Sequence, residues 1–305
     1  MVGSVNVDLV VEVASRPEAG ETVTGSDLVT LPGGKGANQA IAAARLGGSV
    51  ALLGRIGDDT PGKLALAALV AAGVDCADLA TVAGTATGVA LITLTPNGDN
   101  AIVVSPGANR ALTPADVEAT ADRLRRAAVV TLQLELPFPT VSRAAELAAM
   151  AGVRVVLNLA PARQVPTTLM CLLDPLVVNE HEAAALLDFS GASGGTGSTL
   201  VVLAQRLREL GPRSAVITLG GAGAAFAGHD AAGIVPAPRV PALDTTGAGD
   251  AFVGALSLAL ARGHDLDAAC RYGVRAGSFA VRGKGAQTSF PDAEDVPIPQ
   301  ALTRR

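Results

Sequence analysis

The stretch AVVTLQLE, residues 128–135, is mostly apolar and ends on a carboxylate. A second apolar run, VRVVLNLA at 153–160, follows after an expected helix near 140–151, and a third, LVV, covers 176–178. A strand with one face in water alternates apolar and polar residues, whereas continuous apolar runs indicate strands that are buried on both faces. Apolar strands separated by helices are typical of a mainly parallel sheet with helices on both faces. We therefore predict an α/β fold.

The same alternation extends outward from this stretch in both directions. GANQAIAAARLGG at 36–48 predicts a helix that ends on a glycine pair, and SVALLGRIG at 49–57 predicts a strand after it. TPADVEATADRLRRA at 113–127 predicts a helix, and SAVITLGGAGAAFA at 214–227 predicts a strand, a turn and a second strand. No repeat or linker interrupts the pattern, so we expect a single α/β domain over residues 1–305.

Two regions, residues 8–31 and 85–105, alternate apolar and polar residues instead. ETVTGSDLVTL at 21–31 is an example, and PNGDN at 96–100 is a strong hairpin turn. These two insertions predict a small antiparallel sheet outside the main core, which we call the β lid. Such a sheet could cover a site or pair with another subunit.

Composition and charge favour a small-molecule partner. The chain has 305 residues and a net charge of −5 without a basic run, so it lacks the electrostatic footprint of a nucleic-acid-binding protein. Apolar runs such as LALAALVAAGV at 64–74 are shorter than the roughly 20 residues that cross a bilayer, so no membrane partner is expected. MVGSVNVD at the N-terminus does not read as a leader, and we expect a cytoplasmic protein.

Three cysteines, Cys76, Cys171 and Cys270, occur singly. The absence of CxxC spacing argues against a disulfide framework or a zinc site. We expect these cysteines to be buried small hydrophobes.

One glycine-rich loop partly matches a nucleotide-binding motif. GDDTPGKL at 57–64 fits the pattern G-x-x-x-x-G-K, but Leu64 stands where a P-loop has a Ser or Thr hydroxyl for magnesium. We interpret it as a helix start with Thr60 as the cap and Pro61 in the first turn. No G-x-G-x-x-G follows any predicted strand, which disfavours a dinucleotide-dependent dehydrogenase.

The stretch DTTGAGD at 244–250 carries the strongest chemical signal. Small residues at 247–249 leave the amides of a first helical turn exposed, and such amides form an anion hole for a transferring phosphoryl group. Asp250 at the edge of this hole can take the proton of an attacking hydroxyl. The alternative interpretation is a capped helix with Asp250 as a favourable first-turn acid.

Three further stretches offer groups that bind hydroxyls. GGKGANQA at 33–40 combines a turn that a ligand can approach closely with Lys35 and Asn38. GSVNVD places Asn6 and Asp8 on one side of a strand, and Glu135 ends the strand of the opening stretch. Each also has an ordinary interpretation, as a loop, a turn or a solvated carboxylate.

NEHE at 179–182 follows an apolar strand. Asn179 with Glu182 three residues later is a good helix-capping pair. The functional interpretation places this loop beside nucleotide phosphates, with Glu182 organising magnesium and its water.

Taken in order, these motifs resemble the ribokinase branch of the PfkB carbohydrate kinase family over nearly the whole chain. The matching stretches are GSVNVD, PEAGETVTG, GGKGANQA, TGVALI, PGANRALTP, LQLELP, LNLAPAR, VVNEHEA, ITLGGAG, DTTGAGDAF and KGAQTS. The resemblance implies an ATP-dependent kinase that phosphorylates the 5-hydroxyl of D-ribose. It also implies a ribokinase-like fold and a homodimer formed through the β lid.

The resemblance further implies a role for each matching residue. Asp250 corresponds to the catalytic base, and the anion hole comprises Gly247, Ala248 and Gly249. The sugar-contacting positions are Asn6, Asp8, Gly34, Lys35, Gly36, Asn38, Glu135 and Asp250. The ATP-contacting positions are Asn179, Thr218, Gly220, Gly223 and Gly249, with Glu182 for Mg²⁺. The ligands of a monovalent cation, usually K⁺, are Asp244, Thr246, Ala280, Gly283, Gly285 and Ser289.

Two positions depart from the family pattern. Gly283 stands where ribokinases often carry Arg, and Val274 stands where a polar residue often lies near the adenine. The open alternatives are a kinase of the same family for another substrate, namely deoxyribose, a fructose-type ketose or adenosine, and a catalytically silent sugar-binding protein on the same scaffold.

Overall fold

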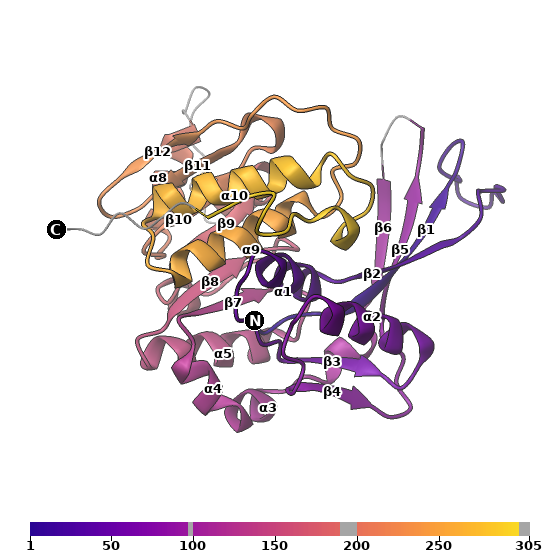
Figure 1. Cartoon of the computed structure of the whole chain (residues 1–305), viewed down its shortest axis with the longest axis horizontal. Coiled ribbons are helices and arrows are strands. Elements are labelled where there is room, and N and C mark those ends of the chain that lie inside the picture. The colour runs from indigo at the N-terminus through magenta and orange to yellow at the C-terminus, as the bar shows by residue number, and fades with distance from the viewer. Residues whose placement is uncertain (97–99, 190–199, 299–305) are drawn as a thin grey trace.

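A six-stranded sheet forms the centre of the larger part of the molecule, in a computed structural model that describes residues 1–96, 100–189 and 200–298 (Figure 1). Its strands run in the order β12-β11-β10-β9-β8-β7. Four of them pair in parallel: β7 (Val129–Gln133), β8 (Arg154–Asn158), β9 (Leu176–Asn179) and β10 (Ala215–Thr218). Two antiparallel strands, β11 (Ala224–Ala227) and β12 (Ala232–Val235), complete one edge.

The apolar runs are buried on both faces of this sheet, as continuous apolar strands require. Successive residues of β8 belong to different cores, because Val155 and Leu157 pack on one face and Val156 on the other. In β10, Ile217 and Val216 divide in the same way. The predicted α/β fold class is therefore confirmed.

Helices cover both faces. One face carries α3 (Pro114–Ala119), α4 (Ala121–Arg126), α5 (Phe138–Met150), α7 (Glu180–Phe189) and α8 (Leu200–Glu209), with the short α6 (Thr167–Met170). The other face carries α9 (Ala248–Ala261) and α10 (Leu266–Ala280). A third core joins α1 (Lys35–Arg45) and α2 (Thr60–Ala71) to Ala251 of α9.

The chain enters the sheet at its N-terminus and leaves it again within a few residues. Val2 bridges Leu132 of β7 and Leu53 in parallel, and β3 (Gly54–Gly57) pairs in parallel with β4 (Leu79–Val82). The predicted strand at 49–57 is thus an irregular segment followed by β3. A few residues after Val2, the chain passes into β1 (Asn6–Glu12), which belongs to a second sheet.

This second sheet has the order β2-β1-β5-β6 and comes from the two alternating segments (Figure 1). It comprises β1, β2 (Val29–Gly33), β5 (Gly88–Leu94) and β6 (Asn100–Ser105). The outer pairs are antiparallel, whereas the central pair β1–β5 is parallel, so the sheet is mixed. Residues 97–99 of the predicted hairpin turn lie outside the described residues.

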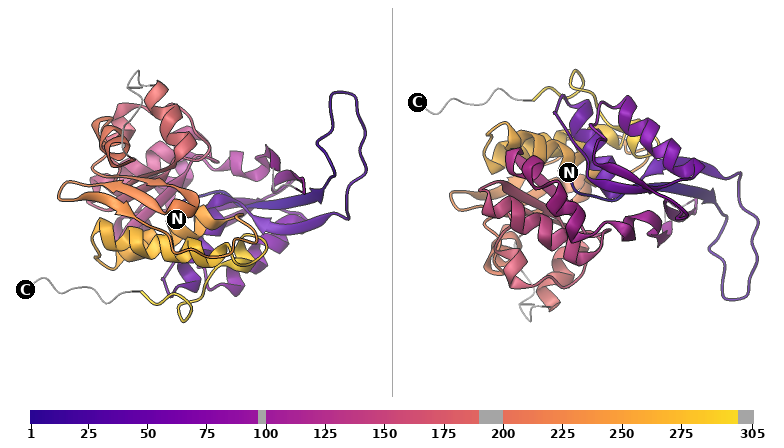
Figure 2. Two further views of the ribbon diagram at one scale, coloured as in Figure 1. Left: turned by 90° about the horizontal axis from the view of Figure 1, so that it is seen from above. Right: turned by 90° about the horizontal axis from the view of Figure 1, so that it is seen from below.

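The second sheet extends away from the main body, and the chain between β1 and β2 reaches farthest from it (Figure 2). One face of β5 is buried, with Ala90 and Ile92 at 6% and 8% exposure, while Leu91 between them is 51% exposed. The lid therefore presents an uncovered apolar face.

Local details differ from the sequence expectations at three places. Asp59, not Thr60, caps α2: Asp59 has the extended backbone of a cap and its carboxylate accepts from Gly62 N, whereas Thr60 is already the first residue of the helix. The helix expected at 113–127 is divided at Thr120. Cys270 is buried as expected, but Cys76 is half-buried and Cys171 is exposed, since Cys171 follows α6 at the surface.

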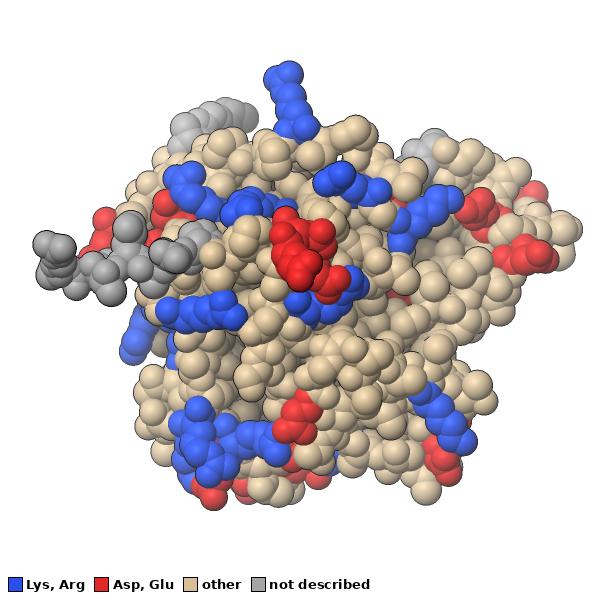
Figure 3. Space-filling model, in the orientation of Figure 1, with Lys and Arg blue, Asp and Glu red and all other residues tan. Residues whose placement is uncertain are grey.

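Three 3₁₀ turns complete the described elements: η1 (Gly107–Ala111), η2 (Gly220–Ala222) and η3 (Gln287–Ser289). Among the described helices, none combines the length and apolar character needed for a transmembrane span. On the face shown in Figure 3, acidic and basic side chains are interspersed.

Candidate active site

A cavity of about 150 Å³ lies where β8, β9 and β10 end and α9 begins. Ligands of open parallel sheets bind at the carboxyl ends of the strands, and this cavity has that position. The lining residues are Lys35, Asn158, Ala160, Val177, Asn179, Glu182, Thr218, Gly247, Gly249, Asp250 and Val253. Seven of the residues singled out from the sequence therefore meet here, from segments more than 200 positions apart.

The start of α9 offers unbonded backbone donors to this cavity. No acceptor among the described residues takes the N–H groups of Gly247, Gly249 and Asp250, whereas Ala248 N donates to Thr245 O at 3.2 Å. Gly247 has φ +76°, and a Cβ there would lie 2.6 Å from that of Ala286, so the turn requires glycine. Two of the three predicted anion-hole amides, those of Gly247 and Gly249, are thus available together with that of Asp250, and a helix start of this kind favours an anion.

Asp250 is 8% exposed and is held by two amides of α1. Asn38 Nδ2 donates to its Oδ2 at 2.9 Å, and Gln39 Nε2 donates to its Oδ1 at 2.9 Å. Gln39 also donates to Asn158 Oδ1 at 3.0 Å. A buried carboxylate is costly unless hydrogen bonds compensate for lost water, and the packing of α1 against α9 supplies them.

Lys35 brings a positive charge to the same cavity from the first turn of α1. Burial lowers the pKa of Lys35, but the carboxylates of Asp250, Glu135, Glu182 and Asp8 outweigh it, so the net pKa is raised. The ammonium group is therefore charged at neutral pH. It interacts electrostatically with both the sugar-side and the nucleotide-side carboxylates predicted from the sequence.

Gly34 sets the position of α1. It caps the helix with φ +89°, and a Cβ there would lie 2.6 Å from Asn6 N. Only glycine combines this left-handed conformation with so close an approach. The turn thereby places Lys35 and Asn38 beside the start of β1.

The predicted sugar-side residues lie at the start of β1 and the end of β7. Glu135 Oε2 accepts from Ser4 Oγ at 2.6 Å and from Lys35 N at 3.2 Å. Asp8 faces the same group of charges: burial first, then Glu135 and Asp250, raise its pKa to about 6.

Asn6, 2% exposed, accepts at Oδ1 from Asn109 Nδ2 at 2.8 Å. One of its two polar atoms is thus occupied inside the protein, as both polar atoms of Asn38 are. Of the predicted sugar-contacting residues other than Asp250, Lys35 alone lines the cavity.

On the nucleotide side, Asn179 and Glu182 form the helix-capping pair expected from their spacing. Glu182 N donates to Asn179 Oδ1, and Asn179 N donates to Glu182 Oε2, both at 2.8 Å. Burial raises the pKa of Glu182 despite that bond and the nearby Lys35. Both residues line the cavity together with Thr218, whereas Gly220 and Gly223 lie in the β10–β11 turn and do not.

The residues predicted to hold a monovalent cation lie on two loops joined by Asp244 and, for Ala280, at the end of α10. Its Oδ1 accepts from Thr246 N at 2.9 Å and its Oδ2 from Gly285 N at 2.8 Å. Burial raises the pKa of Asp244, but the opposite effect of these hydrogen bonds and of Lys284 is larger, so the net pKa is lowered. Across the second loop, a Cβ at Gly283 would lie 2.9 Å from that of Ser289.

These loops offer carboxylate, hydroxyl and carbonyl oxygens, which suit a hard cation. The described residues contain no group of three His, Cys, Asp or Glu side chains arranged for a metal. The donor set is thus compatible with a cation held largely by backbone oxygens.

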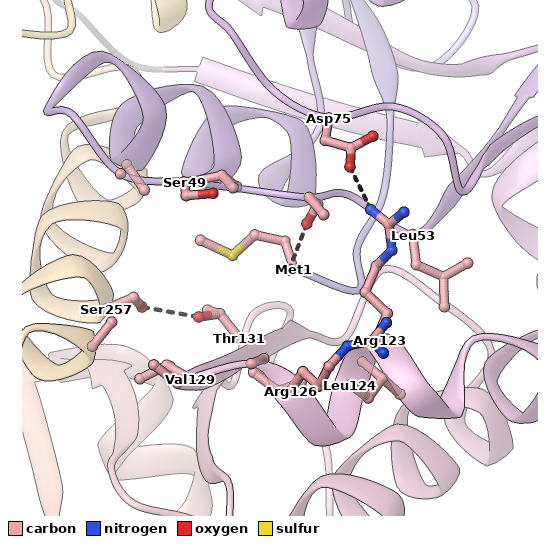
Figure 4. A pocket seen from close by; sticks show the side chains of 18 of the residues that line it. Met1, Ser49, Leu53, Asp75, Arg123, Leu124, Arg126, Val129, Thr131 and Ser257 are labelled. Carbon is pink, nitrogen blue, oxygen red and sulfur yellow. Dashed lines mark hydrogen bonds and ion pairs between the residues drawn. The ribbon is translucent and has the colours of Figure 1, made fainter.

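A larger cavity, of about 350 Å³, opens at the beginning of β7 (Figure 4). Arg123 pairs with Asp75 beside it, and Thr131 donates to Ser257 Oγ at 3.0 Å. The amino group of Met1 donates to Ala51 O at 2.8 Å, and burial lowers its pKa to about 6. None of the residues predicted for the site lines this cavity, which lies at the opposite strand ends from the site.

Several residues that hydrogen-bond to Asp250, to its donors or to the predicted sugar-side residues were missed by sequence reasoning. They are Ser4, Gln39, Asn109, Gln133, Asn158 and Gln287. Gln133 and Asn158 carried a usable signal, since each interrupts an otherwise apolar strand. Gln287, in a loop, carried none.

A helix start with free amides, a buried carboxylate and a lysine, at the carboxyl ends of a parallel sheet, defines an α/β enzyme equipped to bind and transfer an anionic group. Residues 1–293 match the model of the pfkB family carbohydrate kinases, and the chain belongs to this family.

The chain is 38% identical to the ribokinase of Bacillus subtilis, over 97% of this chain and 97% of that protein. It is 36% identical to the deoxyribokinase of Salmonella typhi, over 96% of this chain and 95% of that protein. Among solved structures, the Arabidopsis thaliana ribokinase complexed with ribose and ATP superposes with a TM-score of 0.86. That match has 33% identity and covers 97% of this chain and 96% of the other.

Proposed function

We propose that this carbohydrate kinase transfers the γ-phosphoryl group of ATP to the 5-hydroxyl of D-ribose, giving D-ribose 5-phosphate and ADP. The observation that carries the proposal is the buried carboxylate of Asp250 beside three unbonded N–H groups at the start of α9, in one cavity with Lys35. The similarity to the Bacillus subtilis and Arabidopsis thaliana ribokinases supports the choice of sugar and nucleotide.

In the proposed reaction, Asp250 accepts the proton of the sugar 5-hydroxyl. The sugar oxygen forms a bond to the γ-phosphorus as the bond from that phosphorus to the bridging oxygen of ADP breaks, and the electron pair leaves with ADP. The N–H groups of 247, 249 and 250 stabilise the phosphoryl oxygens. Loss of one such donor typically lowers the rate by about 10²- to 10³-fold.

The sugar is held on the α1 side of Asp250. Lys35, Asp8 and Glu135 provide charged partners for hydroxyls, which suits a small molecule rich in hydroxyls. The remaining sugar-side positions are Asn6, Gly34, Gly36 and Asn38, where glycine permits close approach of the backbone.

The nucleotide is held on the β9–β10 side. Asn179, Thr218 and Gly249 line the cavity there, and Gly220 and Gly223 continue the site along the β10–β11 turn. Glu182 would hold Mg²⁺ through water, and the ion supplies positive charge that offsets the phosphates. Because ATP is the donor, we propose that the enzyme works in the cytoplasm.

A potassium ion would be held by the oxygens of the two loops joined by Asp244. The candidate ligands are Asp244, Thr246, Ala280, Gly283, Gly285 and Ser289. A backbone carbonyl at 283 is independent of the side chain, so glycine there is compatible with the role. When bound, the cation would supply a positive charge near the start of α9.

The test is a coupled assay of ADP release over a panel of sugars, with ATP and with either potassium or a large organic cation. We expect ribose to give the highest kcat/KM and potassium to raise the rate. Faster turnover of fructose or adenosine would overturn the choice of substrate, and equal rates in both salts would remove the cation site.

Deoxyribose is the second candidate, because the Salmonella typhi deoxyribokinase is almost as similar as the ribokinases. The two sugars differ only in the 2-hydroxyl. A ribose-to-deoxyribose kcat/KM ratio below one would assign the enzyme to deoxyribose without changing the mechanism.

We further propose that two copies associate through the lids. The support is the apolar outer face of the second sheet, where the paired residues Leu91 and Val103 are 51% and 65% exposed. Exposed apolar groups of this kind on a sheet are typical of an interface.

A further inference from the structure

Two chains of buried side-chain amides end on the carboxylate of Asp250. In the first, Gln133 Nε2 donates to Gln39 Oε1 at 2.6 Å, and Gln39 Nε2 donates to Asp250 Oδ1 at 2.9 Å. In the second, Gln287 Nε2 donates to Asn38 Oδ1 at 2.8 Å, and Asn38 Nδ2 donates to Asp250 Oδ2 at 2.9 Å. Each carboxylate oxygen thus receives one chain.

The outer members of these chains do not reach the cavity. Gln133 is fully buried on β7, and Gln287 is 8% exposed in η3; neither lines the cavity of the candidate site. Burying a polar amide costs free energy unless it is hydrogen-bonded, and an apolar side chain would pack there without that cost. Packing alone therefore does not explain two buried glutamines at these positions.

Both chains run in the same direction. Every amide donates toward Asp250, and each chain ends in an oxygen that has no partner among the described residues, namely Gln133 Oε1 and Gln287 Oε1. If the amides of either chain pointed the other way, these oxygens could accept a hydrogen bond. An amide oxygen would then face a carboxylate oxygen of Asp250, however, and no hydrogen bond could form there. An ionised carboxylate accepts only, so Asp250 decides the direction of both chains.

We propose that Gln133 and Gln287 are positioning residues for Asp250. Acting through Gln39 and Asn38, they fix both carboxylate oxygens as acceptors and leave the remaining lone pairs of Asp250 for the proton of the substrate. This inference rests on the proposed role of Asp250 as the base. It makes turnover depend on two residues that touch neither the sugar nor the nucleotide.

The test begins with Gln133→Met. The orphaned Gln133 Oε1 disappears and Gln39 Oε1 becomes the orphan in its place, so the number of unpaired buried oxygens is unchanged and we expect little change in Tm. Because Gln39 loses the donor that orients it, we expect kcat to fall about three- to tenfold, with the KM values for sugar and ATP within about twofold. Gln287→Met probes the second chain in the same way and stands in if Gln133→Met does not fold.

The matched control is Thr131→Val. Thr131 lies on the same strand and the same side as Gln133, is 1% exposed and donates to Ser257 Oγ, but has no bond to the network. We expect this variant to keep kcat. An equal loss of kcat in Thr131→Val would overturn the proposal, as would a rise in KM for sugar without a fall in kcat in both glutamine variants.

Asp250→Asn separates this inference from the proposed function. If Asp250→Asn keeps its turnover, the base itself is wrongly assigned and both proposals fail. If Asp250→Asn is inactive while Gln133→Met and Gln287→Met retain full kcat, the base stands and the positioning role alone is overturned.

Discussion

Asp250 shows how a single carboxylate can lie among groups that attract anions. It is buried, yet it receives an amide hydrogen bond at each oxygen and lies in the first turn of α9, where the helix dipole favours negative charge. The free N–H groups of the same turn are left for a second anion. The carboxylate and the anion hole therefore coexist because separate donors satisfy each.

Replacing Asp250 by Asn should remove the acceptor for the sugar proton while preserving shape. We expect kcat to fall by about 10²- to 10⁴-fold, the usual contribution of a general base, with sugar affinity changed only a few-fold. Steady-state kinetics and calorimetric titration with ribose measure the two quantities. A variant that loses sugar binding and keeps kcat would place Asp250 in the binding site only.

Asp8 gives a prediction on pH. Its pKa is about 6 in the folded protein against an ordinary 3.8, so between these values the folded state holds a proton that the unfolded state has released. The free energy of unfolding should therefore decrease as pH rises through this interval. Asn at position 8 does not titrate, so the Asp8→Asn variant does not lose this stability as pH rises. The Tm of the variant should equal that of the parent near pH 4 and exceed it above pH 6. Melting without ligands from pH 4 to 8 provides the measurement, and a difference that does not vary with pH would contradict the prediction.

At the scale of elements, α2 is tied to the lid through its cap. Asp59 Oδ1 accepts from Gly62 N at 2.8 Å, and Oδ2 accepts from Thr87 N at 2.8 Å, one residue before β5 begins. Thr87 Oγ1 in turn accepts from Gly57 N at 2.9 Å, at the end of β3. One carboxylate thus joins the start of a helix to the base of a lid strand.

Asp59→Ala should cost about 1–3 kcal/mol in the free energy of unfolding, since it removes the cap and leaves the Thr87 groups unpaired. The matched control is Asp58→Ala, because Asp58 is exposed and adjacent. Its effect should stay within about 0.5 kcal/mol. Urea unfolding of both variants gives the comparison; equal values would show that the cap does not stabilise the fold.

At the scale of the whole molecule, the lid exposes apolar side chains to water that no other part of its own chain covers. Leu91 and Val103 are directly paired in register on β5 and β6, and both are exposed. Burial of both in a dimer would remove apolar surface from water without altering the main sheet.

The double variant Leu91→Lys with Val103→Lys should convert a dimer to a monomer, because four lysines would meet at the interface of two copies. Light scattering after gel filtration distinguishes one chain of 30.3 kDa from two. Met150→Lys is the control, since Met150 is 81% exposed on α5, away from the lid. A parent protein that is monomeric at all concentrations would exclude the lid-mediated dimer.

Much of the fold was predictable because its signals are local. Continuous apolar runs indicated strands that are covered on both faces, and the alternating segments indicated a half-exposed sheet. The parallel pairing of β1 with β5 was not predictable, since alternation fixes which side of a strand is buried but not the direction of its partner. The cap of α2 was misplaced by one residue because Asp59 and Thr60 are both good capping residues.

The sequence by itself determined the groups to which we assign the proposed chemistry: a glycine-lined helix start, the acid that follows it, and a lysine after a glycine turn. Those are short stretches whose backbone geometry depends on neighbouring residues alone. Only the tertiary structure decided how Asp250 is held, because its two donors lie on α1 and themselves accept from residues of β7 and η3, and these elements meet only in the folded chain. Hydrogen bonds between residues more than 200 positions apart leave no periodicity in a sequence, so their partners become visible only in the folded chain.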